Sequence, residues 1–242
     1  MSLEDRSLNI LCVDTSGPVA GCALTADGRV LHSITALHGR THSESIMPMV
    51  DEALSSSGLA VADLDCIAAV AGPGSFTGVR IGVCLAKGLA HAHDVPCARV
   101  DALEALSMNF AGYEGVVAPI LDARRHQVYC AAFDVSSGLP HRLLDDDALP
   151  IEAFLEKLPA DGRIAFLGDG LDVFAPVIKA ALGDRAFLAP ANLRDIRPET
   201  AAVVAAARRE AWMPGAQLTP IYLRAPQAER ERKARLKQEA DA

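Results

Sequence analysis

The glycine-rich segment 72–90 is the stretch whose residue types and spacing come closest to a site for chemistry. It follows one apolar run and leads into another, as expected for a strand, a tight turn and a helix. Such a turn presents backbone N–H groups and the positive end of the helix dipole to an anion. Gly74 and Ser75 in this turn, with Asp14 at the end of an earlier apolar run, are therefore candidate contacts for a nucleotide or another anion.

The spacing of the glycines argues against a specific nucleotide motif. The segment has the pattern GxGxxxG rather than GxGxxG, and no P-loop lysine follows Gly78. The turn after Asp14 contains Pro18, which has no backbone N–H to offer to a phosphate. An ATP site at this position would lack both a P-loop lysine and one of the backbone N–H donors that bind phosphate.

The helix expected after the turn can instead have a role in packing. Small residues recur at every fourth position, namely Gly78, Gly82, Ala86 and Ala90, and most of the remaining positions are apolar. A helix that is apolar nearly all round is buried on several sides, and small side chains allow a second helix to approach closely. The pattern alone favours a helix of the chain's own core over a helix that contacts a partner.

The other candidate catalytic residues do not form a recognisable set. The sequence has no Gly-x-Ser-x-Gly or His-Glu-x-x-His motif, and its six cysteines occur singly without a Cys-x-x-Cys pair. The seven histidines are not spaced with an obvious third metal ligand. We therefore expect no catalytic residue, no metal site and no bound cofactor.

Composition limits the class of protein. Half of the 242 residues are hydrophobic, which is enough for a substantial core. The net charge of −8 argues against a stand-alone nucleic-acid-binding protein. Single cysteines in apolar runs, with no signal-peptide or membrane-spanning pattern, predict a cytoplasmic protein that does not contact a membrane.

The order of the expected elements predicts an α/β fold with two rounds of the same pattern. The first round has strands at 9–14, 19–25, 29–36, 65–71 and 97–100, with helices at 44–57, from 76, and at 102–110. A weaker second round has strands at 116–121, 127–135, 141–144 and 164–168, with helices at 151–158 and 171–182. This order is that of the actin-like ATPase (ribonuclease-H-like, ASKHA) fold, with two tandem α/β subdomains and mixed sheets. We expect the subdomains at 1–112 and 113–227, followed by a charged tail at 228–242.

Several motifs together resemble one known family. The segments 72–82 and 86–90 are similar to the bacterial TsaB (YeaZ) proteins, as are shorter motifs at 42–44 with Pro48, at 122–125 with Val128 and Tyr129, and at 220–224. The resemblance implies a non-catalytic dimerisation or scaffold subunit of the complex that makes threonylcarbamoyladenosine beside the tRNA anticodon. In that complex the paralogue TsaD transfers the threonylcarbamoyl group, and TsaE is an ATPase partner. The resemblance also implies a homodimer when the chain is alone, and contact with tRNA only within the complex.

The resemblance assigns a partner interface to two helices. In this family, helices 44–57 and 76–92 pair with the same helices of TsaD, or of a second TsaB, as a four-helix bundle. The implied interface residues are Ile46, Met49, Val50, Ala53, Leu54, Gly78, Val79, Gly82, Val83, Ala86 and Ala90. On this view, a bulky residue at Gly82 prevents association and has little effect on folding.

The resemblance further implies that the chain is not an enzyme. TsaD carries a His-Leu-Glu-Gly-His metal motif, whereas this sequence has Ala102 and Leu106 in place of the two histidines. Removing both imidazoles removes the ligands that a catalytic metal needs. The alternative is an actin-like ATP-dependent small-molecule kinase or ATPase, which would depend on Asp14.

Overall fold

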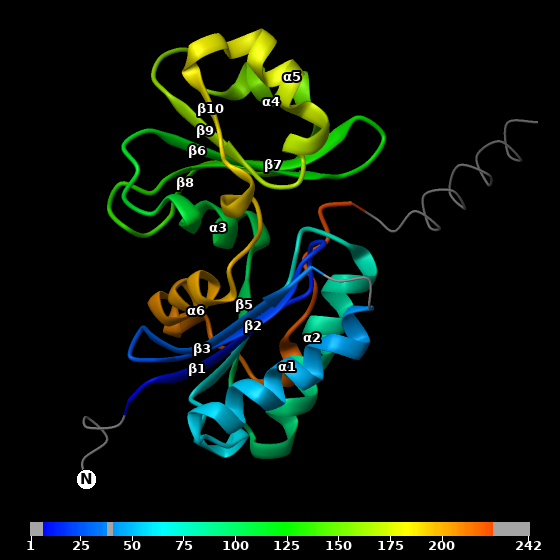
Figure 1. Cartoon of the computed structure of the whole chain (residues 1–242), viewed down its shortest axis with the longest axis vertical. Coiled ribbons are helices and arrows are strands. Elements are labelled where there is room, and N and C mark those ends of the chain that lie inside the picture. The colour runs from blue at the N-terminus through cyan, green and yellow to red at the C-terminus, as the bar shows by residue number, and fades with distance from the viewer. Residues whose placement is uncertain (1–6, 38–40, 225–242) are drawn as a thin grey trace, which may run out of the picture.

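The computed structural model describes residues 7–37 and 41–224, and it shows two lobes that are each built on a five-stranded sheet (Figure 1). The first sheet contains β1 (Asn9–Asp14), β2 (Ala20–Ala26), β3 (Arg29–Ala36), β4 (Cys66–Val70) and β5 (Cys97–Val100). The second contains β6 (Val116–Asp122), β7 (Gln127–Asp134), β8 (His141–Pro150), β9 (Ile164–Leu167) and β10 (Ala186–Leu188). The helices are α1 (His42–Ser57), α2 (Phe76–His93), α3 (Ala102–Ser107), α4 (Ile151–Lys157), α5 (Leu171–Leu182) and α6 (Pro198–Ala207).

The two sheets have the same topology. Their strand orders are β3-β2-β1-β4-β5 and β10-β9-β6-β7-β8, so β6 to β10 repeat the arrangement of β1 to β5. In each sheet the first three strands pair antiparallel, and the fourth and fifth strands run parallel to the first. The predicted actin-like α/β fold with two subdomains and mixed sheets is confirmed.

Burial explains why the central strands are almost continuously apolar. Every residue of β1 and β4 is buried, as is typical of parallel strands covered on both faces. Helices α1 and α2 cover one face of the first sheet, and α6 covers the other (Figure 1). Among the described residues, no helix is both long enough and apolar enough to cross a bilayer.

The end of the described chain returns to the first lobe. Helix α6 packs on β1 and β2, and Met213 pairs with Cys97 of β5. Further along, the N–H of Ile221 donates to the carbonyl of Ala71 at 2.7 Å. The second sheet begins with β6 at Val116, and the segment from 198 to 224 packs on the first lobe although it falls within the expected subdomain 113–227. The expected tail at 228–242 lies outside the described residues.

Two elements differ from expectation for local reasons. Strand β8 extends through Pro150 rather than ending at residue 144, because its aspartates find cationic partners: Asp146 pairs with Arg142, and Asp147 Oδ2 lies 3.2 Å from Lys157 Nζ. Helix α1 begins at His42, two residues before the expected start at 44, and it continues through Pro48.

Candidate functional site

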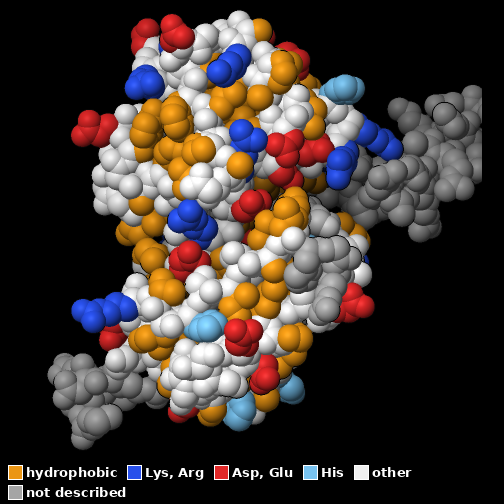
Figure 2. Space-filling view, in the orientation of Figure 1, with side chains coloured by type: hydrophobic (Ala, Val, Ile, Leu, Met, Phe, Trp, Pro, Cys, Tyr) orange, Lys and Arg blue, Asp and Glu red, His pale blue; other side chains and the backbone are white. Residues whose placement is uncertain are grey.

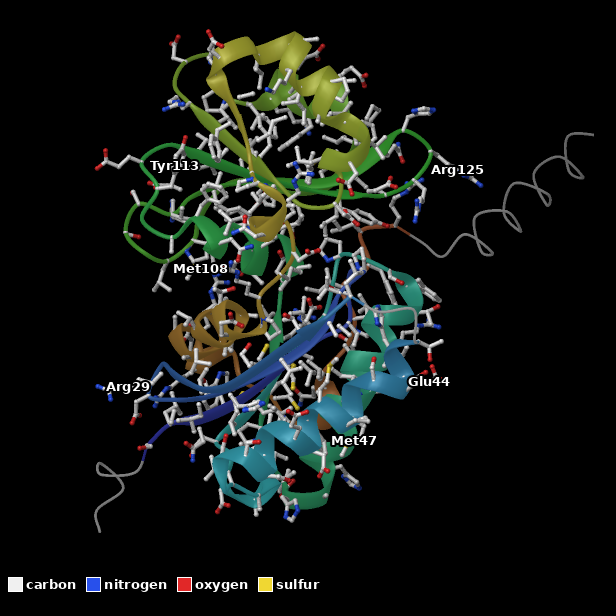
Figure 3. All side chains as sticks on the ribbon, viewed as in Figure 1. Arg29, Glu44, Met47, Met108, Tyr113 and Arg125 are labelled. Atoms are coloured by element: carbon white, nitrogen blue, oxygen red, sulfur yellow. The ribbon has the colours of Figure 1, made fainter. Side chains whose placement is uncertain are left out.

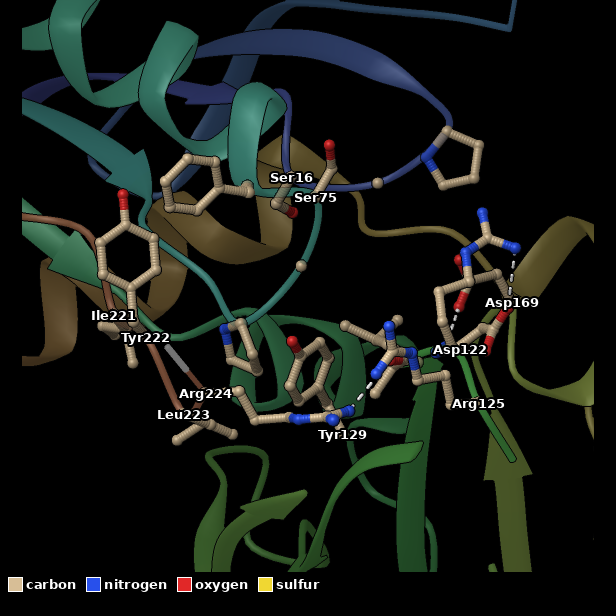
Figure 4. A pocket seen from close by; sticks show the side chains of 18 residues that line it. Ser16, Ser75, Asp122, Arg125, Tyr129, Asp169, Ile221, Tyr222, Leu223 and Arg224 are labelled. Atoms are coloured by element: carbon tan, nitrogen blue, oxygen red, sulfur yellow. Dashed lines mark hydrogen bonds and ion pairs between the residues drawn. The ribbon is translucent and has the colours of Figure 1, made fainter. Parts of the chain in front are cut away.

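A cavity of about 510 Å³ lies between the two lobes (Figure 4). Its walls come from the turn after β1 (16–18), the turn before α2 (73–76), the β6–β7 turn (121–125) and the C-terminal segment 221–224. Each of these segments follows or precedes a regular element, so the duplicated topology brings the loops of both lobes to one place. Ligands of α/β proteins commonly bind where such loops meet.

The cavity wall carries charged side chains of both signs. Arg124 Nη1 lies 3.0 Å from Asp122 Oδ2, and Asp169 Oδ1 accepts a hydrogen bond from the N–H of Asp122 at 2.9 Å. Arg224 Nη1 donates to the carbonyl of Ala123 at 3.2 Å, and Arg125 lies in the same wall. Figure 2 shows acidic and basic side chains gathered together where the lobes meet.

The β6–β7 turn that carries two of these arginines has an unusual backbone. Arg124, Arg125 and His126 have φ values of 62°, 56° and 59°, all in the left-handed region. This conformation costs on the order of 1 kcal/mol or more for each non-glycine residue, and such residues cluster at functional sites. The turn directs Arg125 away from the body of the second lobe (Figure 3).

Asp14 borders a second, small cavity next to the first. This cavity is lined by Asp14, Asp169, Arg194 and Asp195, and it shares residues 16–18 with the larger one. Asp14 is 3% exposed, and its Oδ1 accepts hydrogen bonds from the Ser16 N–H at 2.8 Å and the Ser16 Oγ–H at 2.7 Å. Burial raises the pKa of Asp14 to about 6, against the smaller lowering effect of the two Ser16 hydrogen bonds.

The three candidate anion contacts lie on the same inter-lobe boundary but do not line one cavity. Gly74 and Ser75 line the large cavity, and Asp14 lines the small one. The N–H of Ser75 already donates to the carbonyl of Ser16 at 2.8 Å, and Ser75 Oγ accepts from the N–H of Gly78 at 3.2 Å. Two backbone donors of the turn are therefore already occupied, which weakens it as a phosphate-binding loop.

The glycine stripe of α2 contacts the end of β1. A Cβ atom at Gly78 would collide with the carbonyl of Thr15, and one at Gly82 would lie 2.7 Å from Thr15 Oγ1. That hydroxyl donates to the carbonyl of Gly78 at 2.7 Å, which ties the helix to the strand end. The close approach requires glycine, so the expectation that Gly82 tolerates a bulky residue without loss of stability does not fit this geometry.

All eleven residues expected at the partner interface are buried within this chain. They pack between the two helices and the first sheet, and they are Ile46, Met49, Val50, Ala53, Leu54, Gly78, Val79, Gly82, Val83, Ala86 and Ala90. They form core here, as the helix pattern alone favoured. A contact between these helices and a partner stays a prediction, but the surface that the helices expose consists of other residues.

The two positions at which the resemblance implies histidines in TsaD lie in a packed helix of this chain. Ala102 and Leu106 of α3 are fully buried, and Glu104 between them is paired with Arg208, the residue that follows α6. Burial raises the pKa of Glu104, with Arg208 opposing the shift. Within the part of the chain that the structure describes, no group of three or more His, Cys, Asp or Glu side chains is arranged to hold a metal ion.

Sequence reasoning did not identify four residues of the large cavity as candidates. Tyr129, Asp169, Tyr222 and Arg224 all line its wall. They come from three segments that are far apart along the chain, so no spacing pattern connects them. Tyr129, Tyr222 and Arg224 belong to the motifs that carry the family resemblance, which is the signal that could have indicated them, whereas Asp169 lies in none of those motifs.

Comparison with known proteins identifies the family. Residues 32–231 match the family model described as TsaD: tRNA N6-adenosine threonylcarbamoyltransferase. The tRNA threonylcarbamoyladenosine biosynthesis protein TsaB of Bacillus subtilis (strain 168) is 35% identical over 223 residues, which cover 92% of this chain and 96% of the relative. The protein of the same name from Escherichia coli (strain K12) is 31% identical over 224 residues, covering 90% and 95%.

A solved structure agrees with these sequence relatives. YeaZ from Pseudomonas aeruginosa superimposes with a TM-score of 0.76 at 29% identity, covering 89% of this chain and all of that one. The similarity in sequence and in structure thus extends over nearly the whole length of both partners in each comparison. The chain belongs to the TsaD-like family that the model describes and, within it, to the TsaB (YeaZ) proteins of tRNA threonylcarbamoyladenosine biosynthesis.

Proposed function

We propose that this chain is the non-catalytic subunit that binds and supports TsaD in forming threonylcarbamoyladenosine at the adenosine next to the tRNA anticodon. The observation that carries the proposal is the nearly full-length similarity to curated TsaB proteins, whose names place them in the biosynthesis of this nucleoside. TsaE is the further partner, the chain forms a homodimer when alone, and the complex acts in the cytoplasm.

The proposed docking surface is the outer side of helices α1 and α2. Met47 of α1 is 43% exposed and points away from the first sheet (Figure 3), and Cys84 of α2 is exposed as well. Ile81, Leu85 and Leu89 of α2 are only partly buried by their own chain. Exposed apolar residues on two adjacent helices fit a helical partner surface, because their burial supplies the main free energy of association.

The proposed lack of catalysis rests on α3. The resemblance places the metal histidines of TsaD at the positions of Ala102 and Leu106, and both side chains here are fully buried and cannot bind a metal. The cavity between the lobes lies at the ends of other elements. Support of TsaD through binding is therefore the role that the described residues favour.

The experiment is size-exclusion chromatography with light scattering, on the chain alone and mixed with its cognate TsaD, followed by a titration that gives the Kd. A double variant, Met47→Glu with Cys84→Glu, places two charges on the proposed surface and uses a residue that favours helices. We expect it to weaken TsaD binding by about tenfold or more, because a partner would bury unpaired charges. Thermal unfolding of the variant should be nearly unchanged, since both positions are exposed.

The matched control is Val173→Glu on α5, which puts the same charge on an exposed apolar position of the other lobe. Val173 is 54% exposed, and its variant should bind TsaD like the original chain. Equal affinity of the double variant and the original chain would exclude this surface. If the chain stays monomeric and does not bind TsaD, the proposed function itself is contradicted.

The alternative function is an ATP-dependent small-molecule kinase or ATPase. The inter-lobe cavity, with Asp14 in the small cavity beside it, favours this alternative, because an actin-like enzyme would bind nucleotide between its lobes. The occupied donors of the turn before α2 argue against it. Turnover of ATP by the isolated chain that is lost in Asp14→Asn would establish it, and the absence of turnover above a blank would exclude it.

A further inference from the structure

We propose that the inter-lobe cavity binds a short stretch of single-stranded RNA, with arginine side chains on the phosphates and aromatic rings against the bases. This inference rests on the proposed function in tRNA modification and names a substrate contact made by this chain itself. It follows from the juxtaposition, in one cavity of about 510 Å³, of three guanidinium groups and three aromatic rings.

The cationic groups lie where a strand of RNA could pass. The side chain of Arg124 is 87% exposed, Arg125 projects from the same turn, and Arg224 lies in the same wall (Figures 3 and 4). The carboxylates of Asp122 and Asp169 also line the cavity. Asp14, Asp195 and Arg194 line the adjoining small cavity, so the arginines and carboxylates around the two cavities balance. Contact with a phosphate would therefore depend on the exposed guanidinium of Arg124 itself and not on a net positive field.

The aromatic groups supply stacking surfaces beside these cations. Phe76 and Tyr222 form a tilted pair with centroids 5.2 Å apart, and the Arg80 guanidinium lies 3.7 Å from the centroid of Phe76. Tyr222 is further held by Arg80 Nε, which donates to its hydroxyl at 2.7 Å. Tyr129 lines the cavity from β7 (Figure 4). Rings fixed in advance lose little conformational freedom when a base stacks on them, and stacking accepts any base.

The backbone favours RNA over a free nucleotide triphosphate. A triphosphate site depends on free backbone N–H groups, but the N–H of Ser75 is already bonded to Ser16 and Pro18 has none. The cations instead extend from a surface turn and from the C-terminal segment. Side-chain cations along an open cavity, together with aromatic rings, are the arrangement that proteins use for single strands.

The experiment is fluorescence anisotropy with the full chain and a fluorescein-labelled oligouridine of about ten nucleotides, a length within the range that single-strand sites cover. We expect weak binding at low salt and a slope of log K against log salt of about −2, because up to three phosphates are neutralised at about 0.7 each. The double variant Arg124→Asn with Arg125→Asn should bind at least about tenfold more weakly and show a slope near −0.7. Asparagine is chosen because it tolerates the left-handed backbone of this turn better than most residues.

A second variant separates stacking from charge. Tyr129→Leu removes the ring and keeps an apolar side chain, so it should weaken binding at least about fivefold and leave the salt slope unchanged. The matched control, Arg29→Gln with Arg99→Gln, makes the same change in net charge at exposed positions on β3 and β5. It should alter the affinity less than about twofold, because a surface charge beyond the Debye length is screened.

Three results would overturn the inference. One is equal RNA affinity of the arginine variant and its control, and another is the absence of RNA binding at low salt. The third is binding of a fluorescent ATP analogue, lost in Arg124→Asn, without binding of RNA. Binding of TsaD is measured on the same proteins. If the original chain binds TsaD but not RNA, only this inference is contradicted. If the original chain does not bind TsaD, the proposed function is contradicted.

Discussion

At the scale of single residues, the glycines of α2 determine how closely this helix approaches the first strand. Gly82 faces Thr15 Oγ1, which is buried and already bonded to the carbonyl of Gly78. We expect Gly82→Ala to lower the free energy of unfolding by about 1–3 kcal/mol, since the new methyl group overpacks the site and displaces the hydroxyl. Chemical denaturation measures this change.

Gly88 of the same helix provides the matched comparison. It is exposed, and a Cβ built on it meets no atom within 4 Å beyond its chain neighbours and the adjacent turns of the helix backbone. Gly88→Ala should therefore stabilise the chain by up to about 1 kcal/mol, because alanine is the better helix former. A stabilising effect at both positions would mean that the stripe does not contact Thr15 in solution.

Asp14 makes stability depend on pH. Its pKa is raised to about 6 by burial, above the usual 3.8, so the folded state favours the protonated carboxyl. This contribution is complete below about pH 4 and is lost as pH rises through 6, which amounts to about 3 kcal/mol. The charged groups that act on it are His42, which lowers the pKa, and Asp195, which raises it.

Asp14→Asn tests this dependence, because the amide oxygen can still accept both hydrogen bonds from Ser16. We expect the unfolding free energy of the original chain minus that of the variant to fall by about 3 kcal/mol between pH 4 and pH 7. Titration of other groups cancels in this difference. A difference that does not change with pH would show that Asp14 ionises at its ordinary pKa.

At the scale of elements, the C-terminal segment 213–224 acts as a strap along α2. Lys87 Nζ donates to the carbonyls of Ala216 and Leu218, at 3.0 Å each. We expect Lys87→Met to destabilise the chain by about 1–3 kcal/mol, because two carbonyls lose a charged donor. Hydrogen exchange at the N–H of Ile221 should also become faster. The exposed Lys179 of α5 is the control, since Lys179→Met should change neither measurement.

The elements show how far the sequence could predict this fold. Strands and helices with strong apolar patterns, such as β1, β4 and α5, were predicted at or near their observed bounds. The contact between the glycines of α2 and the end of β1 could not be predicted, because the pattern of small residues favours a core helix but does not indicate which element packs against it. The return of α6 to the first sheet was missed as well, since the order of elements does not determine long-range contacts.

The residues of the candidate site divide in the same way into predicted and unpredicted ones. Asp14, Gly74 and Ser75 were predicted from loop chemistry, and the structure brings all three to the inter-lobe boundary. Tyr129 and Arg224 were not predicted as site residues, because they meet in the cavity only through the packing of the second sheet and the strap. Local turn chemistry can be predicted from a sequence, whereas convergence of distant segments requires the fold.

At the scale of the whole molecule, the two lobes share one core. Ile10, Cys12 and Val70 of the first sheet belong to the same buried cluster as Phe133 and Phe166 of the second. Helices α3 and α6 lie between the sheets and complete this cluster. Two sheets that repeat one topology would by themselves suggest two folding units, but a continuous core makes them one cooperative unit.

This cooperativity can be tested with the single tryptophan of the chain. Trp212 packs near α6 against the first lobe, and its Nε1 donates to the carbonyl of Ala205 at 2.9 Å. Phe166→Leu removes volume from the fully buried core of the second sheet and should cost about 1–2 kcal/mol. We expect the denaturation midpoint followed by Trp212 fluorescence to shift as much as the midpoint followed by far-ultraviolet circular dichroism. If the fluorescence midpoint stays in place while the circular dichroism curve divides into two steps, the lobes unfold separately and the shared core does not couple them.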